Sequence, residues 1–142
     1  MRSIDLNADM GEGFATDLEL LSVVTSANVS CGSYLLSGLP DFEIARAADA
    51  ARVRIGFHPG YPDPETFGRR SYRDLPQEIH AQIHAAFTAS LRQIPVKARY
   101  LKPHGALYHD CMSDGYPRDL VLAMLSGTGL ALMGLPGTEH ES

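Results

Sequence analysis

Short β-prone runs and longer amphipathic stretches alternate along this chain. The β-prone runs predict strands at residues 3–6, 26–29, 54–57, 100–102 and 130–133. Helical spacing of apolar residues, with capping signals at several starts, predicts helices at residues 17–24, 40–52, 75–93 and 118–125. Strict alternation of strands and helices predicts an α/β fold with a parallel sheet, either covered by helices or closed as a barrel.

Polar residues gather at the carboxyl ends of the predicted strands. Because strand side chains alternate between faces, the pattern places one set of polar groups on a single face: Asp5, Asn7, Asn28, His58, Lys102 and His104. His58 and His104 each follow a β-prone run and are flanked by Pro and Gly, which favour sharp turns. Ligand sites of parallel α/β sheets lie at this end of the strands, so these side chains predict an active-site rim.

Two further groups have open interpretations. Asp9 and Glu12 lie in a glycine-flanked turn after the first strand, where acids serve either a site or the turn itself. Arg70 follows Arg69 in a long loop, where an arginine can bind a carboxylate or phosphate through two hydrogen bonds. A structural ion pair is the alternative for this arginine.

Composition narrows the class of protein. The 142 residues predict a single domain over 1–142, and a net charge of −5 argues against non-specific nucleic-acid binding. No apolar run approaches the length of a membrane span, so no membrane partner is expected. Two cysteines in unrelated contexts predict a reducing, cytoplasmic setting. The sequence contains no GxxxxGK[ST] phosphate loop and no GxGxxG dinucleotide motif.

Five motifs in order resemble the signatures of the LamB/YcsF family, whose members are the A subunits of 5-oxoprolinase. They are DLNADMGE from Asp5, TSANVSCG from Thr25, GFHPGYPD from Gly56, FGRR from Phe67 and KPHGALY from Lys102. The resemblance implies the N-terminal part of a distorted (βα) barrel of the glycoside hydrolase/deacetylase type. It also implies ATP-dependent ring opening of 5-oxo-L-proline to L-glutamate with partner subunits B and C, ATP entering through the complex.

Lactam hydrolysis requires carbonyl activation, a positioned water and protonation of the leaving nitrogen. We therefore expect Asp9 or Glu12 to act as base and His58 and His104 to move protons or polarise the carbonyl. Lys102 or Arg70 would hold a carboxylate or an activating phosphate. The remaining polar residues of the same face are expected to bind substrate: Asp5, Asn7 and Asn28. No metal ligands are assigned.

The chain departs from the family pattern in two ways. Tyr34 stands where the family has histidine, and Ser37 where it has aspartate. Family members are also longer, so we expect a truncated, impaired barrel or self-association that covers the gap. Two other functions stay open: a metal-dependent deacetylase-like hydrolase with Asp9, His58 and His104 as ligands, and a non-catalytic module that binds the partner subunits.

Overall fold

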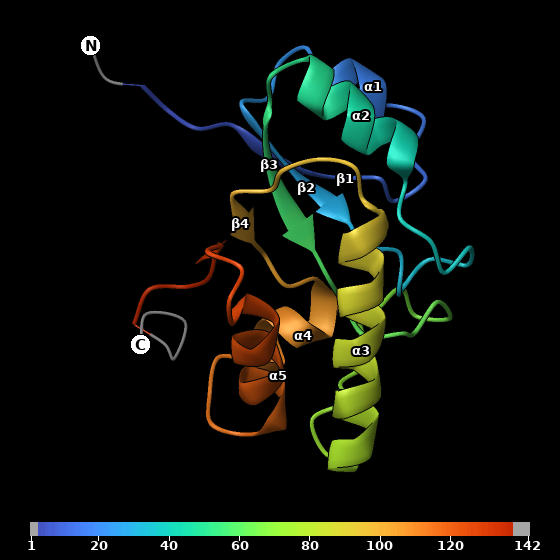
Figure 1. The fold of residues 1–142 in the computed structure, drawn as a ribbon, viewed down its shortest axis with the longest axis vertical. Coiled ribbons are helices and arrows are strands. Elements are labelled where there is room, and N and C mark those ends of the chain that lie inside the picture. The colour runs from blue at the N-terminus through green and yellow to red at the C-terminus, as the bar shows by residue number, and fades with distance from the viewer. Residues whose placement is uncertain (1–2, 138–142) are drawn as a thin grey trace.

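A parallel sheet forms the centre of the molecule. The computed structural model describes residues 3–137, and within them the sheet has five strands. The strands lie in chain order across the sheet (Figure 1). They are β1 (Asn7–Met10), β2 (Ser26–Ser30), β3 (Arg54–His58), β4 (Tyr100–Leu101) and β5 (Ala131–Leu132). The predicted parallel α/β architecture is confirmed by the pairing of every adjacent strand.

Helices pack on one face of this sheet. Those in the described part of the chain are α1 (Asp17–Leu20), α2 (Phe42–Ala50), α3 (Gln77–Gln93), α4 (Gly105–Asp110) and α5 (Tyr116–Leu125). Figure 1 shows α1 and α2 together at one end, while α3 and α5 pack against each other at the other. None of the helices within residues 3–137 combines the length and apolar character needed to span a bilayer.

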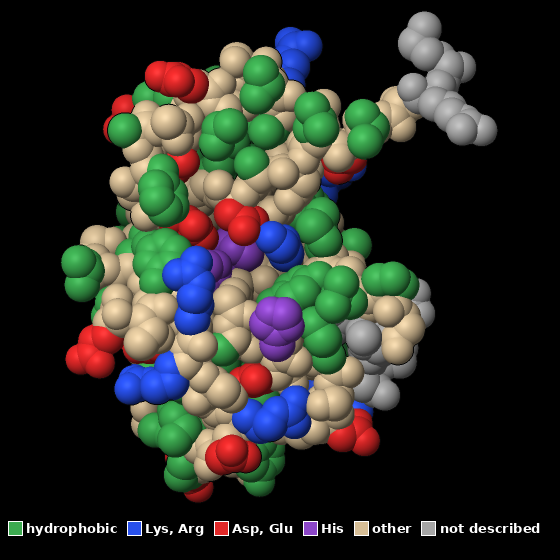
Figure 2. Space-filling view, turned by 180° about the vertical axis from the view of Figure 1, so that it is seen from behind, with side chains coloured by type: hydrophobic (Ala, Val, Ile, Leu, Met, Phe, Trp, Pro, Cys, Tyr) green, Lys and Arg blue, Asp and Glu red, His purple; other side chains and the backbone are tan. Residues whose placement is uncertain are grey.

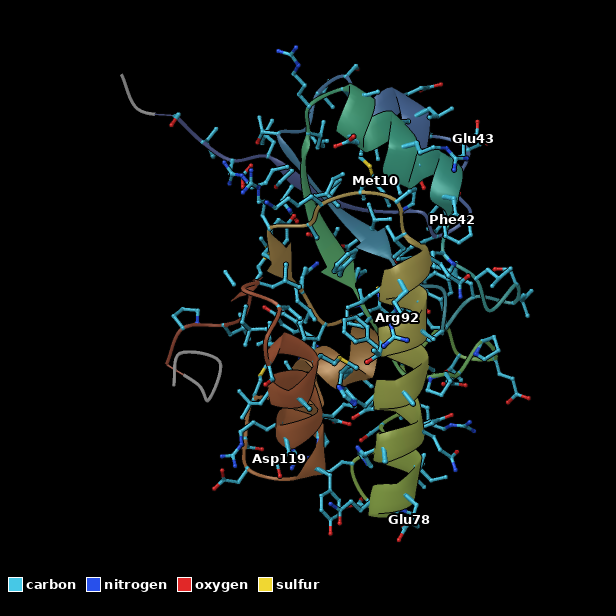
Figure 3. All side chains as sticks on the ribbon, in the orientation of Figure 1. Met10, Phe42, Glu43, Glu78, Arg92 and Asp119 are labelled. Atoms are coloured by element: carbon cyan, nitrogen blue, oxygen red, sulfur yellow. The ribbon has the colours of Figure 1, made fainter. Side chains whose placement is uncertain are left out.

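The hydrophobic core lies between the sheet and these helices. Alternate strand residues such as Val29 and Phe57 are buried with Ala45 of α2 and Phe87 of α3. Met10 ends β1 and lies between the sheet and α2, whereas Glu43, Glu78 and Arg92 extend outward (Figure 3). The apolar faces of the strands therefore pack on helices, and the polar face is left for the site.

Local signals explain where two of the helices lie. The Asp41 side chain accepts hydrogen bonds from the backbone of Glu43 and Ile44, both at 3.1 Å, and so caps the start of α2. The predicted apolar stripe of α3 is confirmed, because Ile83 and Phe87 are both buried.

The first predicted strand was placed too early. Residues 3–6 are not a strand, and β1 begins at Asn7, which pairs with Ser26. Ile4 and Leu6 remain exposed. Polar and apolar residues already alternate before Asn7, but a strand forms only where the residues lie opposite β2 and can form hydrogen bonds with it.

The helix predictions also need correction at their ends. The first helix stops at Leu20, although residues 17–24 were predicted, and α5 begins at Tyr116 rather than at residue 118. Helix α4 was not predicted, because Pro103 and Gly105 are locally typical of chain breaks. Tertiary contacts stabilise it: Leu107 is fully buried, and the Ala106 N–H donates to the Gly68 carbonyl at 2.9 Å.

Candidate active site

A hydrogen-bonded network of polar side chains lines the open face of the sheet. Asn28 of β2 donates to Asn7 Oδ1 at 2.6 Å and to Asp9 Oδ1 at 2.7 Å. The Tyr100 hydroxyl of β4 donates to Asn28 Oδ1 at 2.7 Å. Gly56 makes this reach possible, because a Cβ at that position would overlap the Tyr100 ring. We call the side chains of Asn7, Asn28 and Tyr100 the polar floor of the site, because the charged groups lie above them.

Asp9 joins this floor to the charged groups above it. Lys102 Nζ lies 2.7 Å from Asp9 Oδ1, and His58 Nε2 lies 3.5 Å from Asp9 Oδ2. Burial alone would raise the pKa of Asp9, but its interaction with His58 and the hydrogen bonds from Lys102 and Asn28 outweigh burial and hold the pKa well below its usual range. Asp9 is therefore a carboxylate at physiological pH.

His58 and His104 meet nitrogen to nitrogen at the carboxyl ends of β3 and β4. His58 Nδ1 lies 2.6 Å from the Lys102 carbonyl, and His104 Nε2 lies 2.8 Å from the Phe67 carbonyl. Because a carbonyl can only accept, both of these nitrogens carry the ring proton. The other two nitrogens, His58 Nε2 and His104 Nδ1, face each other at 3.0 Å. Two lone pairs therefore point at one another in the neutral form.

Glu12 completes this cluster. Its Oε1 lies 3.3 Å from His104 Nδ1 and 3.7 Å from His58 Nε2. Burial opposes ionisation of Glu12, but its interaction with His104 and the hydrogen bond from Tyr34 prevail and lower its pKa. These three atoms, Glu12 Oε1, His58 Nε2 and His104 Nδ1, all lie within 4.8 Å of one another and are suited to hold a metal ion. We call them the Glu–His–His cluster.

Tyr34 packs directly against this cluster. Its ring stacks on His104 with centroids 3.8 Å apart and planes 6° apart, and its hydroxyl donates to Glu12 Oε1 at 2.9 Å. Burial, with the nearby Glu12 carboxylate, raises the pKa of Tyr34, so the hydroxyl keeps its proton. The position at which the family resemblance led us to expect histidine is thus filled by a buried hydrogen-bond donor. Ser37, the other departure, is exposed, and its hydroxyl bonds to the backbone of Leu39.

A hollow of about 390 Å³ opens above His58 and His104. Figure 2 shows histidine, acidic and basic side chains gathered around a depression on this face. Besides these two histidines, the lining of the hollow includes Asp9, Arg69, Lys102, Pro103, Gly105, Tyr108 and His109. A small polar molecule bound there would meet both positive side chains and both histidines.

The structure brings most of the predicted residues together. Asp9, Glu12, His58, Lys102 and His104 form one connected group. Two predicted substrate-binding residues do not line the hollow: Asn28 donates to Asp9, and Asn7 accepts from Asn28.

Asp5 and Arg70 lie elsewhere, which corrects their predicted roles. Asp5 precedes β1 at the opposite end of the sheet and pairs with Arg54 at 3.2 Å. Arg70 pairs with buried Asp63 at 3.5 Å, so the structural alternative holds for it. Its neighbour Arg69 lines the hollow instead and lies over the Phe67 ring. Gly68 has a positive φ and turns the chain between Phe67 and Arg69. The glycine was the one feature of the sequence that could have indicated this turn.

The geometry also revises the metal-ligand alternative. The predicted set was Asp9, His58 and His104, but Glu12 rather than Asp9 completes the cluster. Glu12 directly follows the turn at Gly11, whose φ of 73° redirects the chain toward the histidines. Alternation along β1 could not predict that direction, because it ends where the strand ends.

The fold and the site together define a parallel α/β protein with a histidine- and carboxylate-rich centre at its strand ends. The model of the LamB/YcsF family matches residues 4–142, and the chain belongs to this family. It is 38% identical to the A subunit of 5-oxoprolinase from Thermus thermophilus over 97% of this chain.

A solved structure is also similar. It is that of the lactam utilization protein from Thermus thermophilus, with a TM-score of 0.79 and 35% sequence identity over 99% of this chain. The chain spans 59% of the length of the 5-oxoprolinase relative and 61% of the lactam utilization protein.

Proposed function

We propose that this chain contributes to ATP-dependent hydrolysis of 5-oxo-L-proline to L-glutamate, acting with two partner subunits, B and C. The observation that carries the proposal is the paired His58 and His104 beside two carboxylates, at the base of a hollow with two cationic side chains. Membership of the LamB/YcsF family and the name of the 5-oxoprolinase relative support the choice of substrate.

The substrate has two features that match the hollow. Its carboxylate suits Lys102 and Arg69, which both line the hollow. Its ring carbonyl then faces the two histidines, whose unprotonated facing nitrogens can take a proton from the attacking water. Glu12 and Asp9 stabilise the positive charge of that proton.

The histidine pair also suits the proton transfers of ring opening. Addition of one water breaks the amide C–N bond, the hydroxyl going to carbon and the hydrogen to nitrogen. Asp9 and Glu12 have lowered pKa values, which makes them weak bases. We therefore revise the expected roles: the histidine pair takes the proton from water and returns it to the leaving nitrogen, while the carboxylates hold the pair in place.

A cytoplasmic location belongs to the same proposal. Cys31 and Cys111 are both buried and form no disulfide, as expected in a reducing compartment. Burial raises the pKa of each thiol to about 12, so both stay protonated and inert. ATP would be supplied through the assembled complex rather than by a phosphate loop of this chain.

The test is reconstitution with subunits B and C, followed by measurement of glutamate formation and ATP hydrolysis. The wild-type chain is expected to support turnover with its partners and not without them. His104→Ala should abolish turnover while its circular dichroism spectrum stays that of the wild type. His84→Gln, on α3 and outside the lining of the hollow, should stay near wild type. Near-normal turnover by His104→Ala overturns the assignment, and an inactive wild-type complex favours the non-catalytic module.

A further inference from the structure

We propose that Glu12, His58 and His104 form a binding site for one divalent transition-metal cation, with Zn²⁺ as the best match. The carrying observation is that two histidine nitrogens and one carboxylate oxygen all lie within 4.8 Å of one another. The proposal rests on this geometry alone, so it holds whether or not the lactam is the substrate. With the cation bound, the two histidine nitrogens are ligands and do not transfer protons, so the two roles belong to different states of the site.

The histidine tautomers are the first argument. The Lys102 and Phe67 carbonyls take the ring N–H of His58 and of His104. The lone pairs that remain face each other across 3.0 Å, inside a buried cluster that also contains the Glu12 carboxylate. Three electron-rich atoms without a hydrogen between them repel one another. A cation at their centre converts this repulsion into three favourable bonds.

The spacing of the three atoms is the second argument. The edges of their triangle measure 3.0, 3.3 and 3.7 Å. Zinc binds histidine nitrogen and carboxylate oxygen at about 2.0–2.2 Å with tetrahedral angles, which places neighbouring ligands about 3.4 Å apart. The cluster is therefore close to the ligand spacing of zinc without any rearrangement of the backbone.

The surroundings supply the remaining parts of such a site. Two histidines and one carboxylate are a ligand set of zinc sites that keep their fourth position open. That position faces the hollow, because His58 and His104 both line it. Tyr34 is a positioning residue here: its hydroxyl donates to Glu12 Oε1 and its ring fixes the plane of His104. The two backbone carbonyls orient the histidines in the same way.

Calorimetric titration of the chelator-treated chain with ZnCl₂ tests the proposal. We expect one saturable site per chain. Glu12→Gln, His58→Gln and His104→Gln should each weaken binding by more than about 100-fold, since loss of an outer-shell partner alone costs about 10- to 100-fold. Tyr34→Phe should weaken binding by about 10-fold. His109→Gln is the matched control, because it changes an exposed histidine of the same hollow that is outside the cluster.

A second measurement on the wild-type chain covers the case in which a variant fails to fold. Nitrogen NMR of the histidine rings should show large Zn²⁺-dependent shifts at His58 Nε2 and His104 Nδ1, and none at His109. No saturable Zn²⁺ binding by the folded chain, or binding that leaves these two nitrogens unshifted, overturns the proposal. Neither measurement uses lactam, ATP or partner subunits, so failure here is distinct from failure of the proposed activity.

Discussion

Asp9 organises the site at the scale of single residues. It comes from β1, accepts a hydrogen bond from Asn28 of β2, and pairs with Lys102, which follows β4. It also faces His58 at the end of β3. One carboxylate therefore connects side chains from or next to four strands, and its charge is balanced by cationic and polar groups. This arrangement makes stability depend on Asp9 remaining ionised.

We expect acid to weaken the fold through Asp9. Its pKa in the folded protein lies below the unfolded value of about 3.9, so its contribution is complete above that value. The contribution is lost as the pH falls from about 4 toward the folded pKa. The free energy of unfolding, measured by urea titration between pH 6 and pH 2, should fall less steeply with acid in Asp9→Asn than in the wild type. Equal slopes for the two proteins would contradict this role.

The contact between β3 and β4 is decided by one small residue. Gly56 leaves space for the Tyr100 ring, and the ring carries its hydroxyl to Asn28 and Asn7 across the sheet. Any side chain at position 56 would push the ring away and break the polar floor beneath Asp9. The demand for glycine here is steric, because its φ is not in the left-handed region.

Gly56→Ala should therefore destabilise the fold by about 1–3 kcal/mol, the usual cost of overpacking a buried position. The measurement is the free energy of unfolding in urea. Tyr100→Ala serves as the partner in a double-mutant cycle: with the ring removed, the added methyl group has room, so the double variant should lose less than the sum of the single losses. Additive losses, or a Gly56→Ala variant as stable as the wild type, would show that the ring does not set this limit.

At the scale of the whole molecule, the two faces of the sheet differ. One face packs on helices, and the other, polar face has no covering layer among residues 3–137. Within these residues β1 and β5 each have a single strand partner, so both edges of the sheet are unpaired. Several large apolar side chains near β1 and α1 are also exposed, among them Ile4, Phe14 and Leu18. Open edges and exposed apolar groups favour association.

We expect the isolated chain to self-associate. Multi-angle light scattering across a dilution series should report a mass above 15.4 kDa that falls as the protein is diluted. Introducing charge at an exposed apolar site, as in Phe14→Glu, should shift the mass toward that of the monomer. Leu122→Glu, an exposed leucine on α5, is the matched control. A folded monomer at every concentration would be incompatible with this expectation.

Much of this organisation could be predicted from residue order. The alternation of strands and helices predicted the parallel α/β fold, and two-residue periodicity placed His58, Lys102 and His104 on one face. The helical spacing of apolar residues likewise predicted the buried side of α3, where Ile83 and Phe87 lie. Such patterns are local: a side chain's face follows from its neighbours in the same strand or helix.

The remaining features depend on contacts between segments far apart in the chain. His58 and His104 are 46 residues apart, and their facing lone pairs arise from carbonyls of Lys102 and Phe67 on other segments. A turn places Arg69 rather than Arg70 at the hollow. Pairing with β2 likewise decides that β1 begins at Asn7. Local periodicity specifies which face a residue occupies, whereas only packing of the whole chain specifies what it meets there.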